Sequence, residues 1–136
     1  MDNPKFWSHS GKDLNDDYRK KILQLEKEVS FGLWVQVLGQ IIELKGLSEL
    51  YYLEKDSNKI GEQQILTGVW TRTIGQILEA ISVSKQIGET DLEKLIQDQK
   101  VAITGDLLVS IGSAIEVIGG INVLEEETVS PPGIVP

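Results

Sequence analysis

Three glutamates occupy the same place in three similar stretches of the sequence. Glu43 ends GLWVQVLGQIIE, Glu79 ends GVWTRTIGQILE, and Glu116 ends GDLLVSIGSAIE. Carboxylates that project into a helical bundle are the ligands of di-iron and di-manganese centres. Such a centre also needs a Glu-x-x-His pair, and the only histidine, His9, lies outside the three stretches. We therefore keep the three glutamates only as weak candidates for a polar site and assign no metal ligand.

The expected helical register separates these carboxylates. Turn chemistry places one antiparallel hairpin about Ser57 and the next about Thr90. In that register Glu79 lies roughly 12 Å from Glu43 and roughly 22 Å from Glu116 along the axis, at about 1.5 Å of rise per residue. One ion cannot bind all three within a monomer, and a solvated polar stripe is the better interpretation.

Arg72 is the one cation in this stripe. It stands where the first stretch has Gln36, and the hairpin about Ser57 brings it level with residue 42. The register therefore predicts an exposed ion pair between Arg72 and Glu43, a contact typically worth about 0–1 kcal/mol.

Other catalytic or cofactor chemistry finds no support. The chain has no cysteine, and His9 is too isolated to serve as the base for a hydroxyl nucleophile. The glycines do not form a phosphate-binding G-x-x-x-x-G-K-[ST] loop. We predict a protein that is not an enzyme, with no catalytic residue, no cofactor and no metal.

The elements that position these side chains are helices. Apolar residues recur with helical spacing, and no alternating strand pattern occurs. Expected helices cover about 13–54, 59–86 and 90–124. Gly88 is the expected C′ residue of the second helix, and Thr90 with Glu93 forms a capping box for the third. We predict an all-α fold, an antiparallel up-down-up bundle of three long helices. A break near Ser30–Gly32, giving four helices, is the alternative.

The domain organisation follows from local composition. Residues 1–12 contain Pro4 and Gly11 and read as an irregular segment. Residues 13–127 form the bundle, built from internal repeats of about 36 residues. Residues 128–136 include SPPGIVP and are expected to be a flexible, proline-rich tail.

Glycines at heptad spacing are the feature that the stretches share most clearly. Each glycine inside a helix costs about 0.5–1 kcal/mol relative to alanine, so close helix packing should offset them. The register predicts two layers, each with one glycine from each helix: Gly46, Gly68 and Gly112 in one, Gly39, Gly75 and Gly105 in the other. Trp34 and Trp70 are predicted to lie in the core beside them.

Charge and hydropathy restrict the partners. The net charge of −8 disfavours nucleic acid. No secretory apolar region is evident near the N-terminus, so a cytoplasmic location is expected. The first helix is apolar on nearly every side, which predicts a homo-oligomer or another protein partner. The expected function is a structural and interaction module that self-associates. The alternative is a membrane-active protein that inserts on opening or acidification, because Val101–Leu124 is long and apolar.

A short motif in the first two stretches resembles a known group. Gly32-Leu-Trp-Val-Gln-Val-Leu-Gly39 and Gly68-Val-Trp-Thr-Arg-Thr-Ile-Gly75 look like the repeats of uncharacterised repetitive helical proteins from Gram-positive bacteria, which have the form G-x-[WV]-[ILV]-Q-x-[IL]-G. The resemblance covers roughly residues 30–122. Arg72 replaces the motif glutamine, and the third stretch departs from the motif at Asp106, Leu107 and Val109. It implies no activity.

Overall fold

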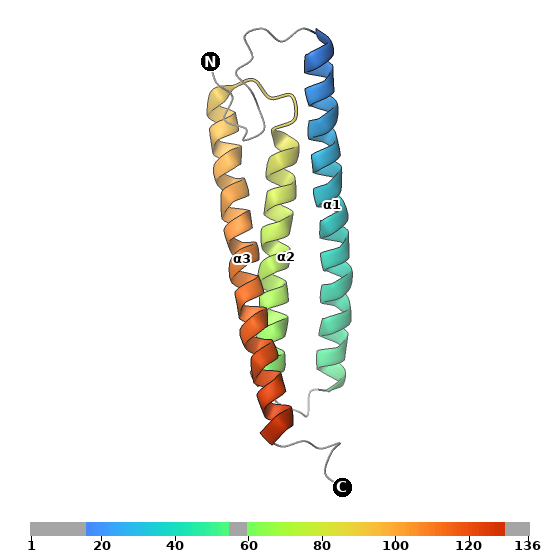
Figure 1. The fold of residues 1–136 in the computed structure, drawn as a ribbon, viewed down its shortest axis with the longest axis vertical. Coiled ribbons are helices and arrows are strands. Elements are labelled where there is room, and N and C mark those ends of the chain that lie inside the picture. Colours follow the sequence, from blue (N-terminus) through green and yellow to red (C-terminus); the bar gives the residue numbers. More distant parts are fainter. Residues whose placement is uncertain (1–15, 55–59, 130–136) are drawn as a thin grey trace.

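The computed structural model describes residues 16–54 and 60–129, and all of its regular elements in that part are helices. They are α1 (Asp16–Leu53), α2 (Ile60–Lys85) and α3 (Leu92–Val129). Successive helices run antiparallel to one another, which confirms the predicted all-α bundle (Figure 1). Because α1 is continuous through Ser30–Gly32, the bundle has three helices and the four-helix alternative is wrong.

α3 extends past the residue at which the tail was predicted to begin. α3 continues to Val129, so residues 128 and 129 are helical. The predicted irregular segment 1–12 and the remainder of the predicted tail, 130–136, lie outside the described residues.

Gly88 and Asp91 shape the connection between α2 and α3. Gly88 has a φ of 69°, which is the left-handed conformation expected after a helix end. Asp91 caps α3, since its Oδ1 accepts a hydrogen bond from the Glu93 backbone N–H at 3.0 Å. The predicted capping box on Thr90 is therefore wrong by one residue, because Asp91 competes successfully for the same free N–H groups.

α2 lies between the other two helices (Figure 1). It packs closely along α3 and more loosely on α1, while α1 hardly touches α3. Half of the buried residues in the described part of the chain therefore belong to α2, including Val69, Ala80 and Val83. Three helices arranged in this way do not enclose a common core.

Burial does not follow hydrophobicity in this fold. Within residues 16–54 and 60–129, only six apolar side chains are buried, namely Val37, Leu44, Val69, Ala80, Val83 and Leu95. Equally many polar residues are buried, namely Glu26, Ser30, Thr73, Gln76, Ser82 and Gln86. The prediction that Trp34 and Trp70 form the core is wrong, because they are 39% and 51% exposed. The large apolar side chains lie mainly on the outside.

Candidate functional site

The tight α2–α3 contact is made by glycines that face each other. A Cβ atom on Gly68 would lie 2.6 Å from the Gly112 carbonyl oxygen, and one on Gly61 would lie 2.9 Å from that of Gly119. A Cβ atom on Gly75 would collide with the Gly105 carbonyl oxygen. Three glycines of each helix thus bring the two backbones together without any intervening side chain, and no larger residue fits at these positions.

The α1 glycines take no part in this contact. A Cβ atom on Gly32, Gly39 or Gly46 would meet nothing within 4 Å, and all three residues are exposed. The prediction that Gly39 and Gly46 complete three-helix layers is therefore wrong. α1 instead packs on α2 through Val37 and Leu44. Each of these lies five residues after a glycine, which places it about 140° around the helix because successive residues are about 100° apart.

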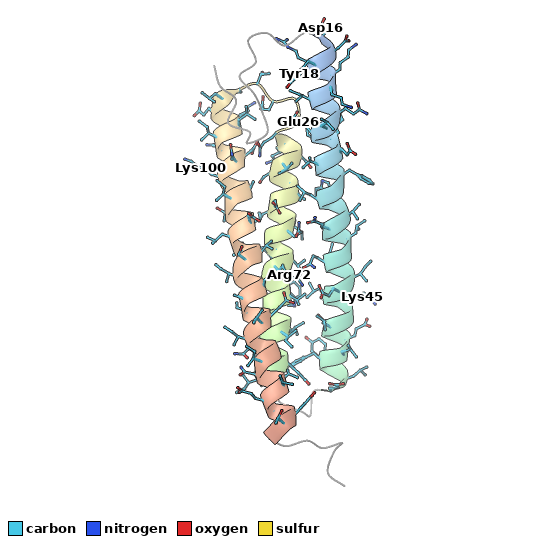
Figure 2. The ribbon with its side chains drawn as sticks, in the orientation of Figure 1. Asp16, Tyr18, Glu26, Lys45, Arg72 and Lys100 are labelled. Carbon is cyan, nitrogen blue, oxygen red and sulfur yellow. The ribbon has the colours of Figure 1, made fainter. Side chains whose placement is uncertain are left out.

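Arg72 connects all three helices at mid-height of the bundle (Figure 2). Its Nη2 donates to Glu43 Oε1 of α1 at 2.9 Å and to Glu116 Oε1 of α3 at 3.2 Å. Its Nε lies 2.7 Å from Glu116 Oε2 as an ion pair, without the alignment of a hydrogen bond. The predicted pair with Glu43 is confirmed, and the second carboxylate makes Arg72 a bridge.

The third candidate, Glu79, lies apart from the Arg72 bridge. Gln76 donates to Gln36 Oε1 at 2.7 Å and more weakly to Glu79 Oε1 at 3.5 Å. Burial raises the pKa of Glu79 from its ordinary 4.5, and the nearby negative charge of Asp106 raises it further. The structure therefore brings Glu43 and Glu116 onto one cation and leaves Glu79 without one.

The raised pKa of Glu79 predicts a pH-dependent effect of the Glu79→Gln substitution. The folded state binds the Glu79 proton more tightly than the unfolded state, so this group favours folding below pH 4.5 and loses that contribution as pH rises through its folded pKa. Glutamine mimics the neutral acid. We expect the variant to melt a few degrees higher than the wild type near pH 7 and at nearly the same temperature at pH 4. Thermal unfolding by circular dichroism at both pH values measures this.

The exposed Glu28 of α1 supplies the matched control for this titration. Glu28→Gln removes the same charge from a solvated site, so its effect on melting temperature should be small at both pH values. Equal responses of the two variants would contradict a specific contribution of Glu79.

A second polar contact joins α1 to the C-terminal end of α2. The Ser84 hydroxyl lies 2.6 Å from that of Ser30 and accepts a hydrogen bond from Trp34 Nε1 at 2.9 Å. The backbone N–H of Gly88 donates to the buried Glu26 at 3.4 Å. Sequence reasoning named Trp34 and Gly88 for other roles and missed Glu26, Ser30 and Ser84 as contact residues. The available signal was their register, because Ser30 with Ser84 and Glu26 with Gly88 are level in a hairpin about residue 57.

The chemistry that this arrangement allows is limited. No group of three or more metal-ligating side chains comes together in the described residues. A shallow apolar groove of about 180 Å³ lies between the end of α1 and the start of α2, lined by Leu50, Tyr51 and Leu66 among others. The site is a set of helix–helix contacts with polar bridges, surrounded by exposed apolar faces.

Comparisons with protein-family models, with curated proteins and with solved structures give no match to this chain. The functional interpretation accordingly depends on the geometry of the chain itself.

Proposed function

We propose that this protein is a non-enzymatic helical module that acts through self-association. The main support for this proposal is the exposure of its apolar side chains. Against six buried apolar residues, 25 large apolar residues are exposed. Soluble monomers rarely expose contiguous apolar patches beyond a few hundred Å², and larger ones mark interaction surfaces. Contact with further copies of the chain would remove that surface from water.

The oligomeric state tests the proposal directly. We expect light scattering after size exclusion to give a mass of at least two chains, and a melting temperature that rises with protein concentration because association stabilises the folded state. A particle of one chain throughout the micromolar range, with a constant melting temperature, would contradict self-association.

A second function is favoured by α3. Its span Leu92–Thr128 is long and apolar enough to cross a membrane by length and composition, and only 11% of its most apolar window is buried. Buried core helices of soluble proteins pass the same length and composition test, but they are mostly buried. The second proposal is therefore a membrane-active protein that inserts on opening or acidification.

Cosedimentation with phosphatidylcholine vesicles at pH 5 and pH 7 tests this second function. Insertion on acidification predicts binding that is stronger at pH 5 than at pH 7. A protein that stays in the supernatant at both pH values would contradict it.

A further inference from the structure

We infer that the open face of α1 binds α1 of a second copy of this chain, antiparallel, with Gly39 on the two-fold axis. This inference rests on the proposed self-association and names its surface. The open α1 face is a stripe at heptad spacing, flanked by Val29, Val35, Ile42 and Leu50. The stripe consists of Leu25, Gly32, Gly39, Gly46 and Leu53.

Among residues 16–54 and 60–129, nothing covers the open α1 face. Ile42 is 71% exposed, Leu53 is 83% exposed, and the three glycines of the stripe have open space above them. Three glycines in a row of heptad positions weaken a helix, and no contact with another described residue offsets that loss at their Cα atoms. A contact outside the chain can do so.

The same chain contains a template for what packs on such a face. Gly61, Gly68 and Gly75 of α2 have the same heptad spacing as the α1 glycines, and they meet Gly119, Gly112 and Gly105 of α3 in antiparallel order. The glycine stripe of α1 is the third of its kind and the one left open. An antiparallel helix with glycines at the same spacing is therefore the partner that fits it, and a second α1 has this spacing.

The stripe is self-complementary when it runs antiparallel to a copy of itself. With Gly39 level with its own copy, Gly32 lies level with Gly46 and Leu25 lies level with Leu53. A two-fold interface needs this property, because each residue must meet its partner twice.

The flanking residues distinguish the antiparallel from the parallel arrangement. In the antiparallel pair, Val35 lies beside Ile42 of the partner subunit, and Val29 lies beside Leu50 of the partner subunit. In a parallel pair the two flanks exchange, and Ile42 would face the charged Glu43 of the partner subunit. The antiparallel arrangement keeps these apolar residues together and places Glu43 beside the uncharged Gln36 of the partner subunit. The opposed helix dipoles also favour it.

Charge limits the interface at its two ends. Glu28 comes near Glu49 of the partner subunit in this register. Lys45, whose Nζ lies 2.9 Å from Glu49 of its own helix, offsets that repulsion. The apolar part of the interface therefore lies between these acidic residues and is centred on Gly39.

Single-cysteine variants test the geometry, since the wild-type chain has no cysteine. Glycine pairs bring Cα atoms into the range of about 4.4–6.8 Å that a disulfide requires. We expect Gly39→Cys to form a disulfide dimer with itself on mild oxidation. Gly32→Cys should crosslink little with itself but readily with Gly46→Cys in an equimolar mixture. Gly120→Cys is the matched control, because this exposed glycine of α3 also has open space above it.

A bulky substitution tests the same face without oxidation. Gly39→Leu is expected to leave the helical content unchanged and to weaken dimerisation at least tenfold, as measured by sedimentation equilibrium. Gly120→Leu should leave the dimer affinity within twofold of wild type.

Each other outcome overturns the inference and separates it from the proposed function. Self-crosslinking of Gly32→Cys would show a parallel pair. The protein could be oligomeric while Gly39→Cys fails to crosslink and Gly39→Leu associates normally. That result would show that the chain self-associates through another surface, and it would contradict only the α1 interface. A monomeric protein that binds phosphatidylcholine vesicles would indicate that its exposed apolar surface contacts lipid and not a second copy. A monomeric protein that does not bind vesicles would contradict both the self-association and the membrane proposal.

Discussion

Gly75→Leu is expected to unfold or rearrange the bundle. Any Cβ atom at this position collides with the Gly105 carbonyl oxygen, and it would also come within 2.8 Å of the Val109 backbone nitrogen. These are backbone atoms of α3, so relief requires the two helices to separate along the contact. Overpacking with adjustable side chains costs typically 1–3 kcal/mol, and we expect more than about 3 kcal/mol here. Thermal and urea unfolding followed by circular dichroism measure the loss.

Gly120→Leu is the matched control for this prediction. It makes the same change in a helix, at an exposed position where a Cβ atom meets nothing within 4 Å. Leucine is the better helix former, so this variant should be more stable than wild type by about 0.5–1 kcal/mol. If Gly75→Leu melted at the wild-type temperature, the close contact between α2 and α3 would be absent in solution. All measurements belong at one protein concentration, because association shifts melting temperatures.

Arg72→Glu is expected to give the second largest loss of stability. The substitution removes the cation that bridges Glu43 and Glu116 and adds a third carboxylate beside them. The side chains of Arg72 and Glu116 are largely withdrawn from solvent, so the repulsion is weakly screened. Removing one partner of a fully buried pair costs about 3–5 kcal/mol, and with partial exposure we expect about 2 kcal/mol or more. Urea unfolding at low ionic strength measures it, and added salt should reduce the loss.

Lys100→Glu is the matched control for Arg72→Glu. It makes the same change in net charge at an exposed position of α3, outside the proposed dimer interface. Surface substitutions of that kind usually change stability by less than about 0.5 kcal/mol. Comparable losses in the two variants would indicate a general effect of net charge, and would contradict a bridging role for Arg72.

The sequence determined the helices and their relative levels. Helical periodicity and turn residues identified three helices, and the ends of α2 and α3 shifted by only a few residues in the structure. Registration about the turns correctly placed Arg72 beside Glu43. Registration about Thr90 likewise placed Gly75 level with Gly105, and these two glycines are in contact in the structure. These predictions succeed because the rise per residue is constant in a helix, so a turn position sets the level of every residue after it.

Only the tertiary structure decided which face of each helix meets which neighbour. GLWVQVLG in α1 and GVWTRTIG in α2 carry the same glycine spacing, so the sequence indicated the same packing for both. The glycine face of α2 accommodates one close helix, however, and α3 occupies it. α1 must then dock on another side of α2, through Val37 and Leu44, and its own glycines turn outward. Helical spacing specifies the face on which residues lie, whereas competition among helices for one surface decides whether that face is covered.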